Sequence, residues 1–142
     1  MPEKKTTYGR VAQALHWLIA GTLILQFPIA WLMPHIGPRT QPDTIINLHL
    51  SFGTTIMFLV IIRLLWRLTH PVPPALASVP RWQRAAASVS HILLYLILLT
   101  LPTLGWASAS ARGFTVSLFG LIPLPGILPA HSRLAGPIGD IH

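Results

Sequence analysis

The sequence predicts an all-α membrane protein with three transmembrane helices, and three observations carry that prediction. Of its 142 residues, 52% are apolar and 9% are charged, whereas a soluble domain carries roughly 25% charged residues. Three apolar runs are each long enough to cross a bilayer, which takes ~20 residues of helix. The basic residues lie at the ends of these runs rather than along one face.

The first span is expected at about 11–33, after a short polar and basic segment. A signal peptide would have a shorter apolar region followed by a small-residue cleavage site, so we expect this helix to be retained. Pro28 is tolerated inside a membrane helix. Trp17 and Trp31 stand near its two ends, where aromatic side chains meet the membrane interface. His16 lies in its second turn.

The second span is expected at about 44–68, after a turn-rich loop. It carries His49 in its second turn and two arginines, Arg63 and Arg67, near its far end. Arginines at that depth can extend toward lipid phosphates. The alternative is that they bind an anionic group of a buried cofactor.

The third span is expected at about 84–109, after a proline-rich connector, and it carries His91 and Tyr95 on one helical face. The segment 110–141 is broken by prolines and glycines, so we expect it to form an external or interfacial segment. Within it, residues 114–121 are a candidate for a short helix along the interface.

The chain is thus expected to be a single membrane domain over 1–142, in which residue 142 begins another helix. Its orientation follows from the lysines and arginines that flank the spans, because cytoplasmic loops carry an excess of them. Seven fall on the side of the N-terminus and three on the other, which predicts a cytoplasmic N-terminus. The seven are Lys4, Lys5, Arg10, Arg63, Arg67, Arg81 and Arg84, and the three are Arg39, Arg112 and Arg133.

The pair His49 and Gly53 is the first indication of a cofactor. The two residues are four apart, so they share a helical face one turn from each other. An imidazole beside a helix surface without a side chain has room for a flat ring and can supply an axial nitrogen. The alternative is that Gly53 lets two helices approach closely while His49 bonds a neighbour. This stretch alone leaves both interpretations open.

Composition excludes several other classes of site. The chain has no cysteine, so it has no disulfide, iron–sulfur cluster, thiolate ligand or covalently attached c-type haem. Three acidic residues make a paired-carboxylate active site a poor candidate. The net charge of +7 is explained by membrane topology, so we expect no nucleic-acid partner.

Three histidines, one in each span, point to b-type haem, which needs two imidazoles on facing helices. His16 and His49 lie near opposite membrane faces and cannot share one haem. The sequence therefore predicts two separate sites, each of which needs a partner ligand.

The three spans together resemble the bacterial cytochrome b-561 family. The segments that carry the resemblance are Arg10–Leu18, His49–Gly53 with Arg63–Arg67, and His91–Tyr95 with Leu101–Trp106. The resemblance implies a four-helix up-down bundle that holds two haems b and exchanges electrons with membrane quinone. Some members are thought to oxidise superoxide at the periplasmic face. This sequence would then supply three of the four expected helices.

Carried over by position, the resemblance implies that His16 ligates a cytoplasmic-side haem, while His49 and His142 ligate a periplasmic-side haem. Gly53 would pack against the ring. The family's last ligand lies beyond residue 142, so His16 would need a partner from a homo-oligomer or another subunit. For His91, contact with a ligand or a haem propionate is expected rather than ligation.

The remaining basic residues carry two interpretations. Arg10, Arg63 and Arg67 are topology markers, or they bind haem propionates.

The expected protein is a bacterial inner-membrane cytochrome, an oxidoreductase with one or two haems b, membrane lipid around it and ubiquinone-type quinone as partner. The alternatives are the haem-bearing anchor subunit of a larger dehydrogenase or hydrogenase, and a non-redox membrane scaffold.

Overall fold

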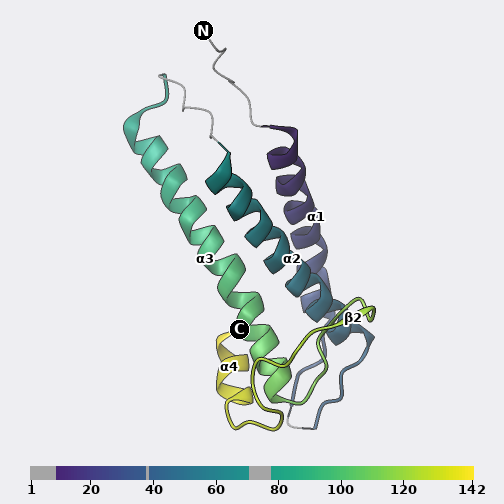
Figure 1. Cartoon of the computed structure of the whole chain (residues 1–142). Coiled ribbons are helices and arrows are strands. Elements are labelled where there is room, and N and C mark those ends of the chain that lie inside the picture. The colour runs from purple at the N-terminus through teal and green to yellow at the C-terminus, as the bar shows by residue number, and fades with distance from the viewer. Residues whose placement is uncertain (1–8, 38, 71–77) are drawn as a thin grey trace.

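The computed structural model describes residues 9–37, 39–70 and 78–142, and it shows three long helices side by side with a small loop assembly at one end (Figure 1). In chain order the elements are α1 (Arg10–Leu32), α2 (Thr44–Thr69), α3 (Arg81–Ala111), β1 (Ser117–Leu118), β2 (Ile122–Pro123) and α4 (Ala135–Ile141). The helices α1, α2 and α3 are each long and apolar enough to cross a membrane. The predicted class, an all-α membrane protein, is confirmed.

The central helix of the bundle is α2. Both α1 and α3 pack against it, and within the described residues the backbones of α1 and α3 do not approach each other closely. The core is formed by Ile19 of α1 with Ile56 and Val60 of α2, all nearly inaccessible to solvent. Partly buried apolar residues surround this core: Leu23, Leu59, Tyr95, Leu98 and Leu99. Side chains of all three long helices therefore meet in this core.

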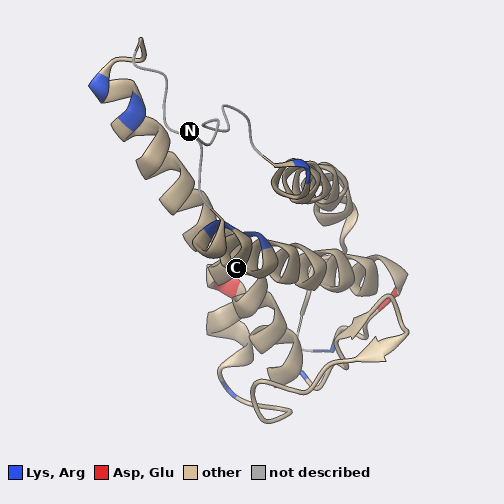
Figure 2. Cartoon of the chain, turned by 45° about the horizontal axis from the view of Figure 1, so that its top comes forward, with Lys and Arg blue, Asp and Glu red and all other residues tan. Residues whose placement is uncertain are grey.

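The outer faces of α1 and α3 are apolar and exposed. Trp31, for example, is 83% exposed and Ile24 is 71% exposed. Figure 2 shows that the charged residues gather near the helix ends and in the loops, while the middle of each long helix carries almost none. Such surfaces match lipid rather than water, as expected for membrane spans.

Two helix boundaries follow from local chemistry. The helix α2 begins at Thr44 because a side-chain oxygen of Asp43 accepts a hydrogen bond from the Ile46 N–H at 2.8 Å, the usual role of an N-cap. The helix α3 begins at Arg81, directly after Pro80, which is three residues earlier than expected. Most of the preceding proline-rich connector, together with Lys4 and Lys5, lies outside the described residues.

The end of the bundle that carries the segments after α1 and after α3 is called here the loop end. The interfacial helix expected at 114–121 is wrong, because this stretch contains β1 and the turn of a short antiparallel hairpin. Phe119 and Gly120 adopt positive φ angles of 50° and 73°, which a tight hairpin turn requires and a helix forbids. The hairpin docks on α2, where Ser51 Oγ donates to the Ser117 carbonyl and accepts from the Phe119 N–H.

The last helix, α4, begins at Ala135, so the expected start at residue 142 is too late. It packs against the end of α3, and Ser108 Oγ of α3 donates a hydrogen bond of 2.9 Å to the Ala135 carbonyl. A glycine- and proline-containing sequence concealed this helix, although proline is well accommodated in a helix's first turn. The position of α4 brings the C-terminal residue back over α3 (Figure 1).

Candidate functional site

The fold brings His49 of α2 and His142, directly after α4, to the same place. Their ring centroids are 5.9 Å apart and their planes are inclined by 80°. Ninety-three positions of sequence separate the two residues, so only the return of the chain through the loop end can pair them. His49 and His142, the two residues that the family resemblance pairs, thus have their imidazole rings near each other at the loop end.

The ring of His142 is oriented by the backbone of α3. Its Nδ1 lies 2.7 Å from the Leu101 carbonyl oxygen. A carbonyl can only accept, so Nδ1 is the donor, and in the neutral ring Nε2 then carries the lone pair. A hydrogen bond of this kind, from the nitrogen that does not bind metal to a backbone carbonyl, is the usual means of fixing an imidazole ligand.

Gly105 makes the space that the His142 ring occupies. A Cβ atom at this position would lie 2.8 Å from Cε1 of His142, which is too short for a real contact, and 3.1 Å from its Nε2, which is tight. Sequence reasoning did not assign Gly105 to the site. The available signal was a glycine inside an apolar span, the same signal that drew attention to Gly53.

The other histidine of the pair is in contact with α1. The Gln26 amide nitrogen lies 3.0 Å from Nδ1 of His49 and donates to the His49 carbonyl at 3.1 Å. The amide oxygen of Gln26 is buried, with no hydrogen-bond partner among the described residues. Buried polar atoms are rarely left unpaired. The amide oxygen of Gln26 can therefore accept one further hydrogen bond.

Two cavities adjoin the histidine pair and share His49, Leu50, Gly105 and His142 in their linings. The first, called here the mid-bundle cavity, has a volume of about 260 Å³ and lies among α1, α2 and α3. The second, the loop-end cavity, has a volume of about 250 Å³ and extends toward the loops. The two cavities adjoin the same two rings, so a ligand larger than either cavity alone could extend into both.

Gly53, predicted to pack against a ring, lines the mid-bundle cavity. A Cβ there would meet the Gln26 amide nitrogen at 3.4 Å, a tight but not forbidden contact. Its role therefore differs from that of Gly105, since it keeps Gln26 close to α2 and leaves the cavity wall smooth.

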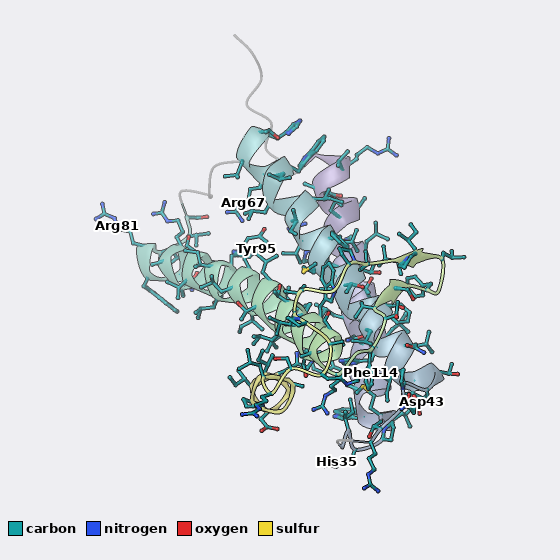
Figure 3. All side chains as sticks on the ribbon, turned by 60° about the horizontal axis from the view of Figure 1, so that its bottom comes forward. His35, Asp43, Arg67, Arg81, Tyr95 and Phe114 are labelled. Carbon is teal, nitrogen blue, oxygen red and sulfur yellow. The ribbon has the colours of Figure 1, made fainter. Side chains whose placement is uncertain are left out.

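The other predicted site residues lie elsewhere. His16 is on the exposed surface of α1, where its ring contacts neighbouring Trp17, and His91 is on the exposed surface of α3. Arg10 and Arg67 are exposed, and Arg63 donates to the Ala12 carbonyl of α1 at 2.7 Å. Figure 3 shows Arg67 and Arg81 at the end of the bundle away from His35, Asp43 and Phe114.

The donor set at the loop end fits haem. Within the described residues there is no group of three or more His, Cys, Asp or Glu side chains able to hold a metal ion. Haem supplies the equatorial nitrogens of its iron itself, so two imidazoles suffice. An oriented imidazole pair, a glycine beside it and largely apolar walls match that requirement. Fold and site together define a class, the membrane proteins that hold haem between their helices.

Comparison with known proteins specifies the family. The model of the prokaryotic cytochrome b561 family matches residues 7–142, so the chain belongs to this family. It is 31% identical to cytochrome b561 homolog 2 of Escherichia coli (strain K12) over 95% of this chain and 72% of the relative. It is 30% identical to "Probable superoxide oxidase CybB" of Yersinia pestis over 95% of this chain and 76% of that protein.

A third relative, cytochrome b561 homolog 1 of Escherichia coli (strain K12), is 33% identical over 66% of this chain and 53% of its own length. Proteins of this family bind b-type haem. The chain is a multi-pass protein of a bacterial membrane, and it is a membrane b-type cytochrome of electron transfer.

Proposed function

We propose that His49 and His142 are the two axial ligands of one haem b at the loop end. The observation that carries this proposal is the hydrogen bond from Nδ1 of His142 to the Leu101 carbonyl, beside the ring of His49. It leaves the other nitrogen of His142 free to bind iron. Gly105 leaves room for the ring of His142, and Gln26 of α1 contacts the ring of His49.

When bound, the haem supplies one-electron chemistry through the iron couple Fe(II)/Fe(III). The residues of the chain bind it, orient it and keep water from its apolar part. The walls of the mid-bundle cavity are suited to this, because most of them are apolar side chains of α1, α2 and α3. No acidic or basic side chain is needed for the transfer of an electron itself.

We further propose that the N-terminus is cytoplasmic and that the loop end faces the periplasm, across the inner membrane. Within the described residues, Arg10, Arg63, Arg67, Arg81 and Arg84 belong to the end where α1 and α3 begin, and Arg39, Arg112 and Arg133 to the loop end. This bias supports the orientation. Fusion of a periplasm-dependent reporter at either end would test it.

His16 is proposed to ligate a second haem near the cytoplasmic side. Its exposed position on α1 is compatible with an imidazole from a further helix, in a second copy of the chain or in a partner subunit. His91, Arg10, Arg63 and Arg67 stay candidates for contacts with that haem or its propionates. Arg63 does not serve the loop-end haem, since it lies about 20 Å along α2 from His49.

Membrane quinone is the proposed redox partner, with superoxide as the electron donor on the periplasmic side. The name of the Yersinia pestis relative supports superoxide. Oxidation of two superoxide anions to dioxygen releases two electrons, and one quinone takes up these electrons with two protons to become the quinol.

The haem proposal is tested by a reduced-minus-oxidised visible spectrum and a pyridine haemochrome count on the detergent-purified chain. We expect His49→Ala and His142→Ala each to lose the loop-end haem. His70→Ala, which removes an exposed imidazole at the end of α2, is the matched control and should keep the wild-type haem count. Wild-type haem content in His49→Ala would refute the assignment.

The redox partners are tested in liposomes that contain ubiquinone and the haem-loaded chain. Superoxide generated outside should reduce quinone in wild-type vesicles, and His49→Ala vesicles should not exceed the background. Quinone reduction equal to that of empty vesicles would exclude superoxide as donor and would favour the role of a haem-bearing anchor subunit.

A further inference from the structure

We propose that Arg112, just past the end of α3, binds the carboxylate edge of the porphyrin held by His49 and His142. This inference rests on the haem site proposed above and adds to it the direction in which the cofactor lies. It assigns to Arg112 a role that sequence reasoning gave to arginines near the other end of the bundle.

The two cavities beside the histidine pair differ in chemistry. Leucine, isoleucine, phenylalanine, proline and tryptophan side chains dominate the lining of the mid-bundle cavity, and it contains no charged residue. The loop-end cavity is lined by Arg112, Asp140, His35 and Ser108 besides its apolar residues. Haem has the same asymmetry, because both of its propionates project from one edge. When bound, haem would place its apolar edge toward the mid-bundle cavity and its propionate edge toward the loop-end cavity.

The position of Arg112 suits an anion. Its side chain is half-buried, and its guanidinium makes a long hydrogen bond of 3.4 Å to the Gly37 carbonyl. No ion pair involves Arg112 within the described part of the chain. Asp43 is engaged as the N-cap of α2, and Asp140 lines the same cavity without pairing with Arg112. A half-buried cation without a paired carboxylate is favourable only with an anionic partner or water.

Small residues keep the surroundings of this guanidinium open. A Cβ atom at Gly139 would lie 3.3 Å from one terminal nitrogen of Arg112 and 3.0 Å from Ser108 Oγ. A larger side chain at position 139 would therefore crowd the guanidinium. The bare backbone of α4 at this point leaves Arg112 accessible from the cavity.

The loop-end cavity also adjoins the surface. A hollow of about 1080 Å³ among the loops shares four lining residues with it: Ile36, Arg112, Phe114 and Asp140. Carboxylates placed at Arg112 would thus meet water from the hollow as well as the guanidinium. Partial hydration lowers the cost of holding two propionates at the membrane boundary.

The test compares haem with its dimethyl ester, which lacks the carboxylates, in binding titrations of the full detergent-solubilised chain. A His16→Ala background restricts the measurement to the loop-end site. We expect this parent to bind haem about tenfold more tightly than the ester, a ratio that corresponds to about 1.4 kcal/mol. Arg112→Gln should abolish the preference, and Arg112→Lys should retain part of it.

Arg133→Gln is the matched control, because Arg133 is an exposed arginine of the same end and lines none of the three cavities described. It should keep the parent's preference. The midpoint potential gives a second readout. It should fall in Arg112→Gln, since an uncompensated carboxylate stabilises Fe(III), and stay at the parent value in Arg133→Gln.

A full tenfold preference in Arg112→Gln would overturn the inference, provided that His49→Ala has lost the haem. Unchanged haem binding in His49→Ala would instead refute the site itself. The two failures are therefore distinguishable. If Arg112→Gln does not fold, the preference of Arg112→Lys for haem over the ester still decides. A preference equal to that of Arg133→Gln would contradict the expected partial loss, because a lysine ammonium does not reproduce the contacts of a guanidinium.

Discussion

The histidines at the two ends of the bundle differ in burial, in hydrogen bonding and in the packing around their rings. At the loop end, His49 is half-buried beside His142, whose Nδ1 donates to the Leu101 carbonyl and whose ring fits over Gly105. At the opposite end, His16 and His91 lie exposed on α1 and α3. A histidine at a suitable depth is therefore only part of a ligand site. The hydrogen-bond acceptor and the space for the ring are what separate the two ends.

The two ends also differ in the long-range hydrogen bonds that their side chains make. Three nearly buried serines bond the loop end together: Ser51 to the hairpin, Ser108 to Ala135 and Ser110 to the Ile127 N–H. At the opposite end, the long-range side-chain bond of Arg63 to Ala12 joins α1 and α2. The loop end is thus organised by its own polar contacts, which join α2 and α3 to the segments that lead to His142.

The largest expected effect comes from filling the space beside His142. In Gly105→Val, a Cβ 2.8 Å from the imidazole forces the ring away from His49, so we expect the loss of one haem per chain in the pyridine haemochrome assay. Gly21→Val is the control, because a Cβ at Gly21 would meet no atom within 4 Å beyond its chain neighbours and the nearby backbone of its own helix. A normal haem count in Gly105→Val would show that His142 does not need its observed position.

A smaller effect is expected from untying the hairpin. Ser51→Ala removes a donor to the Ser117 carbonyl and an acceptor for the Phe119 N–H, which leaves both backbone groups without this partner and should cost about 2 kcal/mol. Thermal unfolding and protease cleavage in the loops at 113–134 would report it. In Thr22→Ala the lost hydroxyl bonds only its own helix, at the Leu18 carbonyl, so equal destabilisation by both variants would disprove the role of Ser51.

The fold class was predictable because its signals are local. Long apolar runs, arginines at their ends and the absence of charge between them establish three spans without any tertiary information. The loop end was predicted poorly for the opposite reason. Phe119 takes a left-handed conformation, uncommon for a residue with a Cβ. Its edge-to-face contact with Phe52 and the hydrogen bond that its N–H donates to Ser51 Oγ support this conformation. Neither contact is visible in the local sequence.

The candidate site shows the same division. His49 and Gly53 were found by helical spacing, and His142 by the family resemblance. Three residues were not assigned to the loop-end site, because each is linked to it by a part of the chain far away in the sequence. Gly105 contacts His142 and Gln26 contacts His49. Arg112 lines a cavity together with residues of α4. The local sequence Leu101–Pro102 gave no indication that the Leu101 carbonyl would accept a hydrogen bond from the side chain of His142.

The smallest expected effect concerns the opposite end. Arg63→Gln removes the 2.7 Å bond to the Ala12 carbonyl that joins α2 to α1. That carbonyl is inside a helix, so no backbone group becomes an orphan, and the loss should be about 1 kcal/mol in thermal unfolding. Arg67→Gln, which alters an exposed arginine one turn away, should change stability by less. The two ends are independent if the visible spectrum of the loop-end haem stays the same in both variants. A shifted spectrum in Arg63→Gln alone would show instead that the position of α1, and with it Gln26 beside His49, depends on the arginine at the far end of α2.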